Sequence, residues 1–136
     1  MGIIARDCMR VVKAAMCAVI PYIRDLTVAE ALGARRAMKF GRDMGYEAIE
    51  LEGDASEIVE AIRNSAKTAN RFGGIIRETR QILESFGSWR ISLVRREGNR
   101  VAHLLAKFAV ANQSHYVWFN VCPSFLVNVV TADHLL

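Results

Sequence analysis

The stretch Ala48-Ile49-Glu50-Leu51-Glu52-Gly53-Asp54 carries the clearest structural pattern in this chain. Apolar and charged residues alternate along it, which is typical of a strand with one buried face. Asp54 ends the stretch, and Glu57 follows three residues later at the spacing of a helix capping box. The sequence therefore predicts a strand over Ala48 to Glu52, followed by a turn and a helix. The apolar side chains expected on the inner face of that helix are Ile58, Val59 and Ile62.

A long helix is predicted before this strand, from Thr27, its expected cap, to Gly45. Helical spacing places Glu30 on the core-facing stripe of this helix. A carboxylate there needs a hydrogen bond or a cation, because burying it bare is costly. Two interpretations stay open: Glu30 meets Asp54 at a divalent metal site, or it is an ordinary residue near a helix start that the helix dipole favours. The small and apolar residues of the stripe are Ala34, Ala37, Met38 and Gly41.

The same helix carries a basic face, which is either solvated or in contact with phosphate groups. Its residues are Arg35, Arg36, Lys39 and Arg42.

The rest of the chain reads as strands and helices in the overall order β-β-α-β-α-α-β-α. A hairpin is expected at the start, with Cys8-Met9-Arg10 as its turn and Asp7 as a turn residue. This order predicts an α/β fold, in which a mixed sheet has helices on its faces. The expected strands are Gly2 to Asp7, Val11 to Ile20 and Trp89 to Val94, and the expected helices follow Gly73-Gly74 and cover Asn99 to Ala111 and Ser124 to His134.

Length and composition exclude several classes of protein. The 136 residues suffice for one domain, and 52% hydrophobic with 24% charged residues argue against disorder. The net charge of +4 permits a polyanionic partner without requiring one. Three cysteines without CxxC spacing suggest neither a zinc knuckle nor a disulfide framework, so we expect an intracellular location, cytoplasmic or nuclear. No segment reaches the roughly 18 apolar residues of a membrane span, and no membrane partner is expected.

Five segments of the chain stand out together: Gly2 to Asp7, Ala29 to Ala31 with Ala34 and Ala37, Ile49 to Asp54, Val94 to Ala102, and Leu104 to Lys107. In their order they resemble the ribonuclease H-like (reverse-transcriptase-like) domains that are common in plant genomes and derived from retroelements. The resemblance implies an α/β ribonuclease H-like domain over 1–112 and an apolar tail with a short helix over 113–136. The tail, with Trp118, Pro123 and Phe125, also looks like the tail of these plant domains.

The family resemblance implies a metal-dependent endonuclease that cuts the RNA strand of an RNA/DNA hybrid. Four carboxylates in the family hold two Mg²⁺ ions, for which Mn²⁺ is an alternative, and hard oxygen ligands suit such ions. By resemblance, Glu30 and Asp54 match two of the four ligands. His103 stands at the place of a third, and imidazole is a poor magnesium ligand. The resemblance therefore implies weak or absent catalysis in this chain.

The fourth ligand of the family lies on a central strand that is expected to precede Met1, so the resemblance predicts a domain truncated at its N-terminus. A protein partner or an oligomer would then complete the sheet, because unpaired backbone groups in a core are costly.

A basic segment before the last long helix offers the contacts expected with RNA/DNA hybrid or another nucleic acid. The residues expected to bind it are Arg95, Arg96, Asn99 and Arg100. Two alternatives to the enzyme remain: a non-catalytic nucleic-acid-binding module, and an inert retroelement fragment or protein-interaction module.

Overall fold

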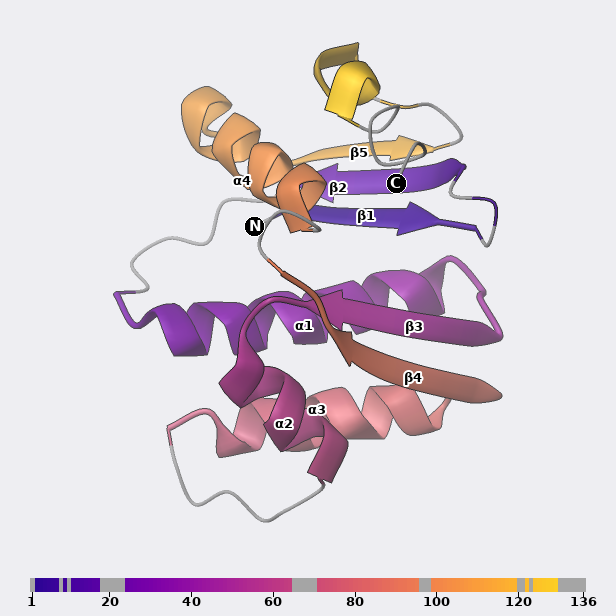
Figure 1. Ribbon diagram of the computed structural model, residues 1–136, viewed down its shortest axis with the longest axis vertical. Coiled ribbons are helices and arrows are strands. Elements are labelled where there is room, and N and C mark those ends of the chain that lie inside the picture. The colour runs from indigo at the N-terminus through magenta and orange to yellow at the C-terminus, as the bar shows by residue number, and fades with distance from the viewer. Residues whose placement is uncertain are drawn as a thin grey trace. The chain divides into compact units, whose positions relative to one another are not determined.

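The computed structural model describes residues 2–7, 9, 11–17, 24–64, 71–95, 99–119, 122 and 124–129. The chain divides into two compact units (Figure 1). The terminal unit consists of Met1–Pro21 with Arg96–Leu136, and the central unit of Tyr22–Arg95. Each unit combines helices with a small sheet, so the expected mixture of α and β structure is confirmed. The strands form two sheets, one of three antiparallel strands and one of two parallel strands.

The central unit packs helices on one face of a parallel sheet. Strands β3 and β4 pair in register from Ala48 opposite Ser88 to Gly53 opposite Leu93. Apolar side chains such as Leu51 and Ile91 face the helices, while Glu50 lies on the polar, exposed face. The elements of this unit are α1 (Leu26–Asp43), β3 (Ala48–Gly53), α2 (Ser56–Asn64), α3 (Gly73–Glu84) and β4 (Ser88–Leu93).

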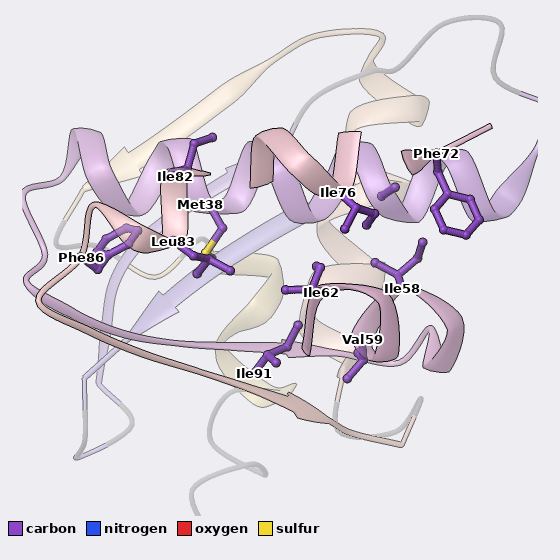
Figure 2. Packing of buried hydrophobic residues seen from close by; sticks show 11 residues of the cluster. Met38, Ile58, Val59, Ile62, Phe72, Ile76, Ile82, Leu83, Phe86 and Ile91 are labelled. Carbon is purple, nitrogen blue, oxygen red and sulfur yellow. The ribbon is translucent and has the colours of Figure 1, made fainter. Parts of the chain in front are cut away.

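The core of the central unit joins all three helices to the sheet (Figure 2). The three apolar residues expected inside α2 are almost completely buried there, with at most 3% of any side chain exposed. Met38 from α1 and Leu83 from α3 are equally buried. The helical and alternating patterns of the sequence are therefore confirmed in this unit. The labelled residues in Figure 2 are Met38, Ile58, Val59, Ile62, Phe72, Ile76, Ile82, Leu83, Phe86 and Ile91.

The cap of α1 differs from the prediction. Asp25, not Thr27, occupies the cap position, and its Oδ1 accepts hydrogen bonds from the backbone N–H groups of Thr27 (3.0 Å) and Val28 (3.3 Å). The helix begins at Leu26, so Thr27 already lies in its first turn. Arg71, just before α3, also forms an ion pair with Asp25.

The terminal unit packs α4 against an antiparallel sheet with strand order β1-β2-β5. The predicted hairpin is confirmed, because β1 and β2 pair and Asp7 Oδ1 accepts the backbone N–H groups of Met9 (2.9 Å) and Val11 (3.0 Å) in the turn. The elements are β1 (Gly2–Arg6), β2 (Val12–Cys17), α4 (Arg100–Asn112), β5 (Tyr116–Phe119) and a 3-10 helix (Ser124–Leu126).

β5 is a strand that the sequence analysis missed. Trp118 packs on the α4 side of the sheet and forms edge-to-face contacts with Phe108 of α4 and with Phe125. This aromatic packing fixes a segment whose composition alone suggested only an apolar tail. The short helix expected over Ser124 to His134 is confirmed at 124–129, and 130–134 lie outside the described residues.

No helix in the part of the chain that the structure describes combines the length and apolar character needed to cross a membrane.

Candidate functional site

The carboxyl ends of the two parallel strands bring Asp54 and Arg95 to one edge of the central sheet. Gly53 and Leu93 are paired at this edge, and the backbone N–H of Val94 donates to the carbonyl of Gly53 at 2.9 Å. Asp54 follows the first strand directly and is partly buried, whereas Arg95 follows the second and is exposed. Such an edge is where open α/β sheets commonly bind ligands.

Helix α2 begins at this edge, one residue later than the capping box predicts. The carbonyl of Ala55 accepts the backbone N–H groups of Ile58 (3.1 Å) and Val59 (3.0 Å), so Ala55 occupies the cap position. Asp54 therefore lies one residue before the cap, between the strand and the helix. Glu57, the expected second half of the box, lies exposed in the first turn.

Helices α1 and α3 begin at the same end of the central unit. Asp25 caps α1 and pairs with Arg71 next to the start of α3, and the charge of Glu57 in α2 also acts on Arg71. The hydrogen bond with Asp25 is the main reason why the pKa of Arg71 is raised. Figure 1 shows β3 and β4 running toward this end. The positive N-terminal ends of three helices thus gather near the strand ends.

Glu30 lies in the second turn of α1 and is exposed, so the prediction that it faces the core is wrong. The rest of the predicted stripe is confirmed, because Met38 and Gly41 are buried and Ala34 and Ala37 pack against the core. In the turn of Glu30 the buried residue is its neighbour Ala31. Ala31 is completely buried in the same apolar cluster against which Ala55 packs. The turn that carries Glu30 and the turn that follows Asp54 therefore share one core.

The two acidic residues of β3, Glu50 and Glu52, lie on its exposed face, as the alternating pattern predicts. Glu50 accepts hydrogen bonds from Arg90 (2.7 Å) and from the Ser92 hydroxyl (2.6 Å), and Arg90 is the main cause of its lowered pKa. Glu52 is exposed. Within the described ranges, no three or more His, Cys, Asp or Glu side chains gather in a group that could hold a metal ion.

The remaining candidate residues belong to the terminal unit. His103 is partly buried in α4, Arg100 is the exposed first residue of that helix, and Asn99 occupies its cap position without a capping side-chain hydrogen bond. One turn of α4 thus brings these three together. Arg96 lies outside the described residues.

The sequence analysis missed Asp25 and Arg71, which join the starts of two helices. A signal for Asp25 was present, because an aspartate directly before the helical run Leu26 to Val28 is a favoured cap. No sequence pattern pointed to Arg71, because its partner is 46 residues away.

Comparison with solved structures identifies two relatives of this fold. RNase H1 from the halophilic archaeon Halobacterium salinarum NRC-1 matches with a TM-score of 0.59 and 26% identity, over 63% of this chain and 66% of that one. The N-terminal RNase H domain of a Mycobacterium tuberculosis protein, solved as a fusion with maltose binding protein, matches with a TM-score of 0.53 and 16% identity, over 65% of this chain and 67% of that one. The chain thus spans just under two thirds of the first structure.

No protein of curated function matches the sequence. A family model does: residues 1–109 fit the model described as "Reverse transcriptase-like". This match includes α1, β3 and most of α4, and hence the turns that carry Glu30, Asp54 and His103. With most of its length matched to the model and its fold matched to RNase H structures, the chain belongs to the reverse transcriptase-like family and is an RNase H-like domain.

Proposed function

We propose that this domain binds nucleic acid, with an RNA/DNA hybrid as its preferred ligand, and that it cleaves the hybrid weakly or not at all. One observation carries the proposal: Arg95 and Asp54 follow paired strand ends where three helices begin. An exposed arginine and helix N-termini both favour phosphate groups. The two solved relatives are RNase H proteins, which supports the same class of ligand for this chain.

The carboxylates at this end suit a divalent cation only in part. Glu30 and Asp54 supply the hard oxygen atoms that Mg²⁺ or Mn²⁺ prefers, and a bound ion would polarise a phosphoryl oxygen and activate water. The place of a third family carboxylate is taken by His103, whose imidazole suits softer ions. By resemblance only two of the four family carboxylates are present, which supports weak or absent hydrolysis.

Hybrid binding is tested by fluorescence anisotropy with a labelled RNA/DNA hybrid at several salt concentrations. The logarithm of the affinity should fall linearly with the logarithm of the salt concentration. Arg95→Gln should weaken binding and reduce the salt slope by about one. Arg77→Gln is the control, because it removes an exposed arginine of α3 that does not follow either strand. Absence of salt-dependent binding by the unmodified chain would overturn the proposal.

A second candidate function, as a protein-interaction module, is favoured by a different observation. β5 is one of the two outer strands of its sheet among the described residues, and Val117 and Phe119 on it are 47% and 55% exposed. Unpaired edge strands with exposed apolar side chains can pair with a strand of another chain. Concentration-dependent self-association in sedimentation experiments, together with no hybrid binding, would favour this function over the first.

A further inference from the structure

Three cationic side chains lie on one side of helix α1 and form no ion pair with another described residue. Arg36 and Arg42 are exposed and Lys39 is partly exposed. They follow one another at spacings of three residues, so they form a row about 9 Å long on the helix surface. We call Arg36, Lys39 and Arg42 the α1 cationic row.

Four other cations of the central unit have ion partners, whereas the row brings three cations without one among the described residues onto a single helix. Arg63 pairs with Glu60, Arg71 with Asp25 and Arg90 with Glu50. Arg35, next to the row, is also taken, because its Nη1 lies 2.7 Å from Glu78. By contrast, no ion pair is found between any residue of the row and another described residue, although the carboxylate of Asp43 is close to it in sequence.

The positive charge of the row is local, because the central unit as a whole is almost neutral. Between Tyr22 and Arg95 the sequence has 12 Lys and Arg residues and 11 Asp and Glu residues, a net charge of +1. Three unpaired cations on one side of one helix are therefore an arrangement specific to α1.

The row lies on the opposite side of α1 from Glu30. Nine residues separate Glu30 from Lys39, and at about 100° per residue this is two and a half turns, which places the two on opposite sides. A ligand in contact with the row is therefore not held by the carboxylate side of the helix. The row is also distinct from Arg95, which follows β4 at the edge of the sheet.

We propose that the α1 cationic row is a second contact surface for the phosphate backbone of nucleic acid, separate from the end that carries Asp54 and Arg95. This inference rests on the proposed function, because it assumes a nucleic-acid ligand. Long cationic side chains in a row contact phosphates without reading sequence. A lipid surface fits less well, because membrane-surface helices need a free apolar face, and α1 buries Ala31 and Met38 in the core.

The test compares two triple variants with the same loss of charge. The first variant is Arg36→Gln, Lys39→Gln and Arg42→Gln. The matched control is Lys13→Gln, Arg63→Gln and Arg90→Gln, which removes three exposed cations that are already ion-paired. Thermal melts establish that both remain folded, and neither set should alter stability greatly, because exposed ion pairs contribute little.

Anisotropy titrations of the labelled hybrid then separate the outcomes. The row variant should bind about tenfold or more weakly at low salt, with the salt slope reduced by about two to three, while the control should bind much like the unmodified chain. Equal binding by the two variants overturns the second surface and leaves the proposed function standing. No binding by the unmodified chain overturns both, as does binding only to phosphatidylserine vesicles.

Discussion

Gly2 shows how a single residue determines packing in the terminal unit. A Cβ atom added to Gly2 would lie 2.1 Å from the carbonyl oxygen of Ala102 and 2.4 Å from Cβ of Leu105, both in α4. Strand β1 therefore contacts the backbone of α4 at a distance that only glycine permits. The sequence showed a short β-like run at this position, but no sequence pattern revealed that a helix 100 residues later would lie against it.

Gly2→Ala should destabilise the chain by about 1–3 kcal/mol, because the backbone of α4 has to move to accommodate the methyl group. Urea unfolding followed by circular dichroism measures this loss. Gly74→Ala is the matched control, since nothing lies within 4 Å of a Cβ added there in α3. Alanine at that position should be neutral or slightly stabilising. Equal effects of the two changes would contradict the close packing of β1 on α4.

Glu30 is the residue whose role the sequence left most open. If it contributes to cation binding with Asp54, Mg²⁺ should raise the melting temperature of the unmodified chain, since a ligand of the folded state stabilises it. Glu30→Gln and Asp54→Asn should each reduce this rise. Glu84→Gln removes an exposed carboxylate at the end of α3 and should leave the rise unchanged. A rise that is the same in all three variants would remove Glu30 and Asp54 as candidate ligands.

At the scale of elements, the sequence predicted best where packing follows a regular period. β3, β4, α2 and α3 alternate or repeat as their buried faces require, and their positions were confirmed to within a few residues. β5 was missed because its packing depends on the contact between Trp118 and Phe108, and Phe108 lies in α4. The sequence also did not predict that α1 and α3 begin side by side at the candidate site, because the ion pair that joins their starts, Asp25 with Arg71, links residues far apart in the chain.

The start of α1 provides a prediction at the element scale. Asp25 both caps the helix and pairs with Arg71, and the hydrogen bond from Arg71 is the main reason why the pKa of Asp25 is lowered from its ordinary value of 3.8. Asp25→Asn keeps a capping oxygen but loses the charge, and Asp25→Ala loses both. The melting temperature at pH 7 should therefore fall in the order wild type, Asn, Ala.

The pH dependence separates the two roles of Asp25. A lowered pKa in the folded state means that the stabilisation is present above pH 3.8 and is lost as the pH falls through the lower, folded-state value. The difference between the wild type and Asp25→Asn should therefore shrink as melts are taken from pH 7 down to about pH 2. A difference that stays constant over this range would show that the charge of Asp25 does not contribute.

At the scale of the whole molecule, the family could be inferred from the sequence because several weak segments occur in the right order. The match to the reverse transcriptase-like model over residues 1–109 and the resemblance to RNase H structures confirm that inference. Catalytic activity was harder to infer than the family, because it depends on how many metal ligands lie within reach of the same ions. The family resemblance implies that Glu30 and Asp54 match two ligand positions and that His103 stands in place of a third, but a sequence does not give their arrangement.

The most direct test of the central claim measures binding and cleavage on the same RNA/DNA hybrid. Purified chain is titrated into labelled hybrid with Mg²⁺ present, and the samples are followed by anisotropy and then separated on a denaturing gel. We predict salt-dependent binding with cleavage far slower than that of an RNase H with all four carboxylates, because loss of a metal contact typically costs several kcal/mol in the transition state. Rapid Mg²⁺-dependent cleavage that Asp54→Asn abolishes, or no binding at all, would contradict the account.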